Sequence, residues 1–128
     1  MGQGGCFLKV LVDSSVWIPF LRGHSELPKE VSVGMSEGRA HLCPVVWVEI
    51  FRGVRGKREE RIAKELSALC PSLPMDDQAW EEAARLGLVA TQSGLNCPLA
   101  DVLTVACAKR HGATLVHNDK HFEALEKL

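Results

Sequence analysis

No apolar run in this sequence approaches the length of a membrane-spanning helix. Such a helix needs about 20 consecutive apolar residues, whereas the first apolar stretch, residues 7–12, is short and is interrupted by Lys9. Residues 1–6 contain no basic segment of the kind that begins a secretory signal. We therefore expect a cytoplasmic protein without membrane association, in which residues 1–6 are a disordered leader that contributes nothing to function.

The chain also lacks the paired cysteines of a zinc site and an excess of positive charge. Its cysteines are far apart in the sequence: Cys6, Cys43, Cys70, Cys97 and Cys107. Structural zinc sites usually contain closely spaced pairs, so we expect reduced and mostly buried thiols instead. The formal net charge is −1 at pH 7. A nucleic acid would therefore have to bind to a local basic patch rather than to a basic protein as a whole.

What the sequence does contain is an alternation of short apolar segments and longer helical patterns, without repeats or linkers. We expect strands at residues 7–12, 40–43, 72–75 and 114–117. We expect helices at residues 16–21, 27–38, 44 to about 53–55, 57–69, 77–92, 98–110 and 120–128. Strands that alternate with helices in this way indicate an α/β domain, in which helices cover both faces of a parallel sheet.

Four acidic residues lie at the ends of apolar segments or within them. Asp13 and Asp119 follow the first and the last predicted strands, whereas Glu49 and Asp101 lie within apolar predicted helices. A buried carboxylate without a partner is costly. In open α/β sheets, functional sites form outside the carboxyl ends of the strands. We therefore expect the four carboxylates to meet around a divalent cation.

Each of these acids also has an ordinary structural interpretation. Asp13 and Asp119 are suitable helix N-caps, and Asp101 in a first helical turn favours the helix dipole. Glu49 is harder to explain, because its helix looks buried on almost every side and gains nothing from a carboxylate. Taken together, the four indicate an acidic pocket. Oxygen ligands without a Cys or His cluster suit Mg²⁺ or Mn²⁺, which are ions that serve phosphodiester hydrolysis.

The segments around these acids resemble PIN-domain ribonucleases, in particular the VapC toxins of bacterial and archaeal toxin–antitoxin pairs. The resemblance is carried by LVDSSVWI (residues 11–18), VEIFRG (48–53), PLADVLTVA (98–106) and ATLVHNDKHF (113–122). All four blocks occur in the family's order, and the similarity covers nearly the whole chain from about residue 7. It implies a single PIN domain over residues 1–128. It also implies a three-layer α/β/α fold with a central parallel sheet of four or five strands.

The resemblance further implies a Mg²⁺- or Mn²⁺-dependent endoribonuclease that cuts RNA, with tRNA or rRNA as possible targets. A VapB-type antitoxin and a homodimer are the implied partners. The family's catalytic and metal-binding acids fall on Asp13, Glu49, Asp101 and Asp119, and its supporting hydroxyl falls on Ser15. Where the family usually has Thr or Ser, this chain has His117, which could bind metal, bind phosphate or only fill space.

Two other functions are compatible with parts of this sequence. The departure at His117 leaves open a catalytically weak PIN domain that acts by binding RNA or a protein partner. A phospho-receiver module would also gather acids around Mg²⁺, but the strand before Asp119 supplies no lysine and the acids come in the wrong order.

Basic and aromatic residues near the acids are the remaining candidates for contact with RNA. The expected phosphate contacts are Arg22, Arg52, Arg55 and Lys120. For the basic cluster after Glu49, a solvated helix face paired with glutamates is an equally good explanation. Trp17, Trp47 and Trp80 could stack on bases, but their apolar neighbours favour packing in the core.

Overall fold

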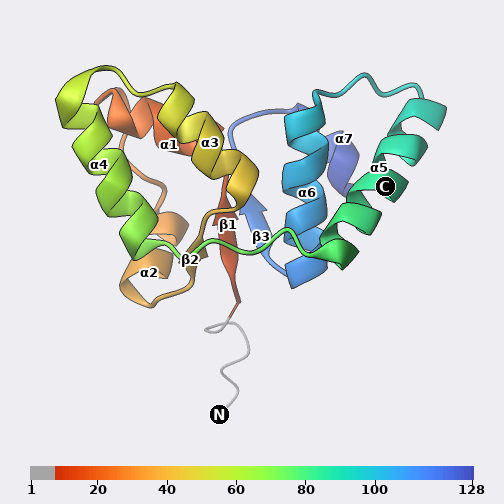
Figure 1. Cartoon of the computed structure of the whole chain (residues 1–128), viewed down its shortest axis with the longest axis horizontal. Coiled ribbons are helices and arrows are strands. Elements are labelled where there is room, and N and C mark those ends of the chain that lie inside the picture. Colours follow the sequence, from red (N-terminus) through yellow and green to blue (C-terminus); the bar gives the residue numbers. More distant parts are fainter. Residues whose placement is uncertain (1–7) are drawn as a thin grey trace, which may run out of the picture.

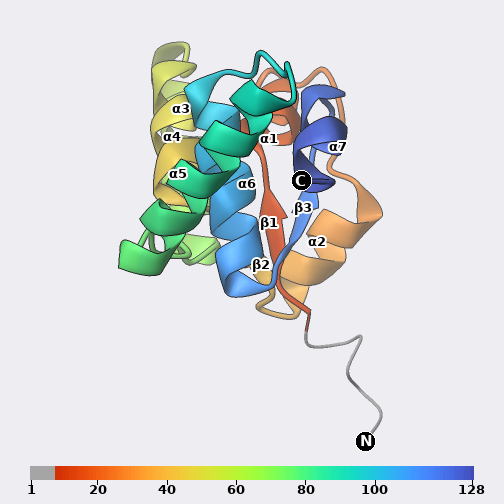
Figure 2. The ribbon, with the colours of Figure 1, turned by 90° about the vertical axis from the view of Figure 1, so that its right-hand side faces the viewer.

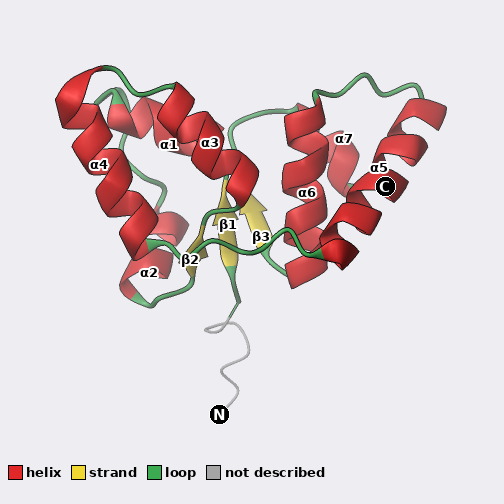
Figure 3. Cartoon of the chain, viewed as in Figure 1, coloured by secondary structure: helices red, strands yellow, loops and turns green. Residues whose placement is uncertain are grey.

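Three parallel strands in the order β2–β1–β3 form the centre of the fold. The computed structural model describes residues 8–128, so the predicted leader lies outside the described residues. The strands are β1 (Val10–Val12), β2 (Ala40–His41) and β3 (Thr114–Val116) (Figure 3). Every side chain of β1 is buried, as expected for a central strand that is covered on both faces.

The described residues contain fewer strands than the four or five predicted. The predicted strand at 72–75 contributes only a parallel bridge between Ser72 and Leu42. Leu42 N–H donates to the Pro71 carbonyl at 3.2 Å, and Leu73 N–H donates to the Leu42 carbonyl at 2.8 Å. Because Pro71 has no N–H group to donate to the Ala40 carbonyl, and Pro44 has none to donate to the Leu73 carbonyl, the ladder cannot extend in either direction. The prediction of a full fourth strand was therefore wrong.

Seven helices accompany these strands in the described part of the chain. They are α1 (Ser14–Leu21), α2 (Lys29–Ser36), α3 (Pro44–Arg52), α4 (Gly56–Leu69), α5 (Asp77–Gln92), α6 (Leu99–His111) and α7 (His121–Glu126). All seven were predicted, with shifts at their ends. The end of α6 shows why the sequence was informative: Gly112 follows it in the left-handed conformation, with φ 64°, which glycine adopts without strain.

The helices cover both faces of the sheet, as predicted. Figure 2 shows the sheet between α3–α6 on one side and α2 and α7 on the other, and Figure 1 shows α1 near the carboxyl end of β1. The core between the layers contains Trp17, Leu11, Leu86 and Phe122, all fully buried. No helix within residues 8–128 is long and apolar enough to cross a bilayer.

Helix α3 is amphipathic rather than buried on every side. Val46 and Ile50 lie in the core, but Trp47 and Val48 are 48% and 52% exposed. The prediction of a buried helix was wrong here, as was the prediction of core packing for Trp47 and Trp80, of which the second is 51% exposed. An apolar sequence does not distinguish a side chain in the core from one in a surface patch.

Candidate metal centre

The carboxyl end of β1 places Asp13 at the edge of the sheet. Asp13 is only 4% exposed and is the N-cap of α1, where its Oδ2 accepts the backbone N–H of Ser15 at 2.9 Å. Its own N–H donates to the carbonyl of Val116 at 2.9 Å, which joins the ends of β1 and β3. Asp13 is therefore the helix cap that the sequence suggested and also lies where the loop after β3 begins.

Glu49 reaches the same region from α3. Its Oε1 accepts a hydrogen bond from the Ser14 hydroxyl at 3.1 Å, which connects α3 to the first turn of α1. Partial burial raises the pKa of Glu49, and the negative charges of Asp13 and Asp101 raise it further. The Ser14 hydrogen bond and the Arg52 charge act in the opposite direction. The electrostatic influence of two other acids means that Glu49 belongs to a group of carboxylates.

Asp101 in α6 and Asp119 after β3 complete this group. Burial raises the pKa of Asp101, and the charges of Asp13 and Asp119 add to the rise. His121 opposes it, because its Nδ1 lies 3.7 Å from Asp101 Oδ2 and 3.2 Å from Asp119 Oδ1. One potential ligand atom from each of Asp101, Asp119 and His121 lies within 4.8 Å of the others.

Acids from four separate segments of the chain thus influence one another electrostatically, and ligand atoms of Asp101 and Asp119 lie within 4.8 Å of each other. Asp101 is influenced by Asp13 and Asp119, and Glu49 by Asp13 and Asp101. Carboxylates whose charges act on one another resist full ionisation. A divalent cation would relieve this repulsion. Carboxylate oxygens suit Mg²⁺ or Mn²⁺. The residues present therefore fit the metal that the sequence led us to expect.

Comparison with known proteins identifies the family. The sequence model of the PIN domain matches residues 10–128. The chain belongs to the PIN-domain family. Ribonuclease VapC11 of Mycobacterium tuberculosis is 29% identical over 124 residues, which are 93% of this chain and 92% of the relative. VapC ribonuclease Mb1587 of Mycobacterium bovis gives the same figures. The predicted family is confirmed.

Solved structures agree with the predicted α/β fold of this PIN domain. DNA-bound VapBC from Salmonella typhimurium matches with a TM-score of 0.79 and 18% identity, over 91% of each chain. VapBC-5 from Mycobacterium tuberculosis matches with a TM-score of 0.69 and 22% identity, over 94% of this chain and 91% of that chain. At these identities the structures show a common fold, and the predicted three-layer class is confirmed.

Ser15 connects the first turn of α1, which follows Asp13, to the loop of this PIN domain that carries Asp119. Its Oγ accepts the backbone N–H of Asn118 at 3.0 Å, and the Asn118 side chain donates to the Ser15 carbonyl at 3.4 Å. Ser15 was predicted as a supporting hydroxyl, whereas neither Asn118 nor Ser14 was predicted to belong to the site. Their positions next to Asp119 and Asp13 in the sequence could have indicated a role. Nothing in the sequence showed that Asn118 would bond to Ser15 or that Ser14 would bond to Glu49.

Ser15→Ala should destabilise the loop that carries Asp119. The substitution leaves Asn118 N–H without its acceptor, which should cost about 1 kcal/mol of unfolding free energy, measurable by urea denaturation. Ser15→Thr keeps the hydroxyl and is the matched control. If both variants unfold at the wild-type urea concentration, the hydrogen bond does not stabilise this loop.

His117 is not one of the three residues whose potential ligand atoms cluster, which are Asp101, Asp119 and His121. Its Nε2 is 3.3 Å from Glu126 Oε1, and its ring packs on Phe122 with a centroid distance of 4.9 Å. Its Nδ1 accepts the backbone N–H of Asp119 at 3.3 Å. His117 therefore holds α7 and positions the backbone of Asp119, whereas His121 is the histidine that approaches the carboxylates.

The four basic residues proposed for RNA contact differ in their surroundings. Arg22 is largely buried and pairs with Glu59 at 2.6 Å, so its guanidinium supports the fold. Arg55 is exposed, and its backbone N–H donates to the same Glu59 oxygen at 2.9 Å. Arg52 and Lys120 are exposed. Arg52 influences Glu49 electrostatically, and Lys120 is adjacent to Asp119, so these two are the better candidates.

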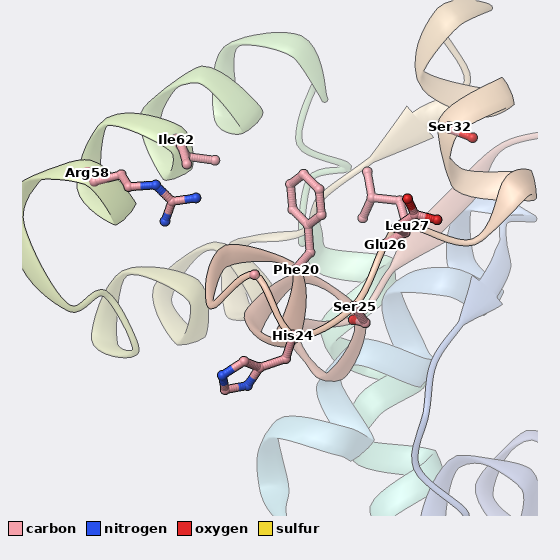
Figure 4. A pocket seen from close by; sticks show the side chains of 9 residues that line it. Phe20, His24, Ser25, Glu26, Leu27, Ser32, Arg58 and Ile62 are labelled. Atoms are coloured by element: carbon pink, nitrogen blue, oxygen red, sulfur yellow. The ribbon is translucent and has the colours of Figure 1, made fainter.

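A hollow on the described part of the PIN domain is separate from the acids. It has a volume of about 670 Å³ and is lined by residues of α1, α2, α4 and the loop after α1. Figure 4 shows Phe20, Leu27 and Ile62 around it, together with Arg58 and His24. None of the four candidate acids lines this hollow. Its lining combines apolar side chains with polar ones and with both a basic residue, Arg58, and an acidic one, Glu26.

Proposed function

We propose that this PIN domain is a metal-dependent endoribonuclease and the toxin of a toxin–antitoxin pair. The observation that carries the proposal is that the charges of Asp13 and Asp119 raise the pKa of Asp101, while those of Asp13 and Asp101 raise the pKa of Glu49, so that acids from four segments influence one another. Its relatives with 29% identity are VapC ribonucleases. A cluster of carboxylates that repel one another is a site for a hard cation, and RNA phosphodiester hydrolysis is the chemistry that such a cation serves.

Asp13, Asp101, Asp119 and Glu49 would hold Mg²⁺ or Mn²⁺. When bound, such an ion activates a water molecule and neutralises charge on the phosphate. The chain's own contribution is orientation: Ser14 fixes one oxygen of Glu49, and Ser15 fixes the loop of Asp119. The raised pKa of Glu49 suits its second oxygen, Oε2, to accept a proton from the attacking water. Arg52 and Lys120 would hold the flanking phosphates of the RNA.

A VapB-type antitoxin and a second copy of the chain are the proposed protein partners. The solved relatives include VapBC complexes. Exposed apolar side chains on α3, including Trp47 and Val48, and Trp80 on α5 support a protein interface. The hollow lined by Phe20, Leu27 and Ile62 would suit apolar side chains of an antitoxin segment. The substrate RNA, which could be tRNA or rRNA, places the proposed action in the cytoplasm.

The alternative of a PIN domain that only binds RNA or a partner arose from His117. In the structure this side chain turns to Glu126 and Phe122, and the acidic cluster is intact without it. Nothing at the site therefore favours binding without cleavage, and hydrolysis remains the proposal.

Removing the metal should abolish cleavage. The purified chain should cut structured RNA in Mn²⁺ or Mg²⁺ and leave 5′-phosphate ends. EDTA should slow cutting by about 10³-fold or more, because the ion contributes several kcal/mol to the transition state and each 1.4 kcal/mol is about tenfold. Added Mn²⁺ should restore the rate. Gel electrophoresis of end-labelled RNA measures both effects.

Two controls separate this result from its alternatives. Asp77→Asn removes an exposed carboxylate of α5, outside the cluster, and should cut at the wild-type rate. Cleavage that persists in EDTA would contradict the metal mechanism. Tight RNA binding without any cutting in Mn²⁺ would favour the binding module.

A further inference from the structure

We propose that His121 is a nitrogen ligand of the metal centre and makes this site favour Mn²⁺ over Mg²⁺. The inference rests on the proposed function, since it concerns the same metal. None of the family's matched site positions falls on His121. Its place in the structure, however, is between two of the carboxylates, with Nδ1 3.2 Å from Asp119 Oδ1 and 3.7 Å from Asp101 Oδ2.

These separations are close to those of neighbouring ligands around one ion. Ligands at right angles in an octahedral site with bonds of 2.0–2.1 Å lie roughly 3 Å apart. The three potential ligand atoms of Asp101, Asp119 and His121 all lie within 4.8 Å of one another. One ion can therefore be reached by all three side chains with small adjustments.

The backbone brings His121 to this position. It is the first residue of α7, and its N–H donates to Asp119 Oδ1 at 3.0 Å. This short turn folds the side chain of residue 121 back toward the carboxylate two residues earlier. Asp101 comes from a different helix and is mostly buried, with a side-chain exposure of 15%. The imidazole therefore faces two acids that are fixed by different parts of the fold.

An exposed histidine beside two aspartates could also be a simple counter-ion, and the His121 side chain is 57% exposed. The two roles predict different behaviour of His121 when a metal ion binds. A counter-ion is displaced when the cation arrives, whereas a ligand stays and brings nitrogen into the coordination shell. Imidazole suits transition-metal ions, whereas Mg²⁺ is bound mainly by carboxylates, phosphates and water. A ligand role therefore predicts a preference for Mn²⁺.

The test is pulsed electron paramagnetic resonance on the full chain loaded with Mn²⁺ alone. Wild-type protein should show ¹⁴N hyperfine coupling to the bound ion, and His121→Asn should lose it. His24→Asn should keep it, because His24 lines the hollow that none of the four acids lines. His121→Asn should fold normally, since the removed ring is exposed and the backbone bond to Asp119 remains.

Calorimetric titration gives a second measurement that does not involve RNA. Loss of the nitrogen ligand should weaken Mn²⁺ binding by about tenfold or more, while Mg²⁺ binding should change much less. The role of His121 would be overturned if wild-type protein bound Mn²⁺ without ¹⁴N coupling, or if His121→Asn showed the same coupling as wild type. Either result would leave the nuclease proposal standing. Failure of wild-type protein to bind either ion would overturn both.

Discussion

Asp101→Asn should reduce RNA cleavage by about 10³-fold and yet make the metal-free protein more stable. Asp101 is influenced by two other acids and one histidine, so it lies at the centre of the proposed metal site. Its loss removes a ligand and should forfeit several kcal/mol of transition-state stabilisation, at about tenfold for each 1.4 kcal/mol. The rate is measured with Mn²⁺ at pH 7.

The stability effect has the opposite sign because the pKa of Asp101 is raised in the folded protein above its ordinary value of 3.8. A group with a raised folded pKa destabilises the fold when it ionises, and the penalty grows as the pH rises from 3.8 through the folded value. At neutral pH the penalty is fully present, and asparagine removes it. The favourable helix dipole at this first turn partly offsets the gain.

Thermal unfolding in EDTA measures this effect. At pH 7 the Asp101→Asn protein should melt a few degrees above wild type. The difference in Tm should shrink as the pH falls toward 3.8, the ordinary pKa of an aspartate. Added Mn²⁺ should raise the wild-type Tm strongly, since an ion at 100 times its Kd stabilises by about 2.7 kcal/mol. The variant should respond less. A lower Tm for the variant in EDTA would contradict the repulsion described for this site.

Glu59→Gln should cost about 2–3 kcal/mol of unfolding free energy, or roughly a 10 °C fall in Tm. Glu59 Oε1 accepts both the Arg22 guanidinium at 2.6 Å and the Arg55 backbone N–H at 2.9 Å. The side chains of the Arg22–Glu59 pair are 13% and 11% exposed. Without Glu59, the guanidinium is left largely buried without its opposite charge. The pair connects α1 to α4, so its loss should loosen the packing of both helices.

The exposed pair of Glu60 and Lys64, 3.0 Å apart on the same helix, is the matched control. Glu60→Gln should change stability by less than about 0.5 kcal/mol. Replacement of Arg22 and Glu59 together by methionine should be less harmful than Glu59→Gln, because no buried charge is left alone. Equal stability of Glu59→Gln and Glu60→Gln would show that burial does not strengthen this pair.

The sequence predicted the helices well because residues that begin or end a helix, such as Asp76 and Gly112, can be recognised locally. Helix α5 has the predicted bounds: the Asp76 side chain caps it by accepting the N–H of Ala79 at 2.9 Å, and it ends before Ser93. The strand at 72–75 failed because an apolar segment reveals nothing about its pairing partner, and the prolines beside it could be weighed only once Leu42 was known to lie opposite.

The candidate site was predictable as a set of acids but not as a network. Asp13, Glu49, Asp101 and Asp119 stood out because carboxylates in apolar segments need an explanation. The bonds from Ser14 to Glu49 and from Asn118 to Ser15 link residues far apart in the chain. Both His117 and His121 lie two residues from Asp119 in the sequence, and only the path of the backbone after β3 directs His117 to Glu126 and His121 to the acids.

The pairing of β1 with β3 also determines when the proposed metal site can form during synthesis of the chain. Asp13 emerges early from the ribosome, but its N–H partner Val116 and the neighbouring Asp119 are made about a hundred residues later. A growing chain that still lacks β3 and α7 has no means of gathering the proposed ligands. The proposed nuclease activity should therefore be absent until β3 has been made and has docked against β1.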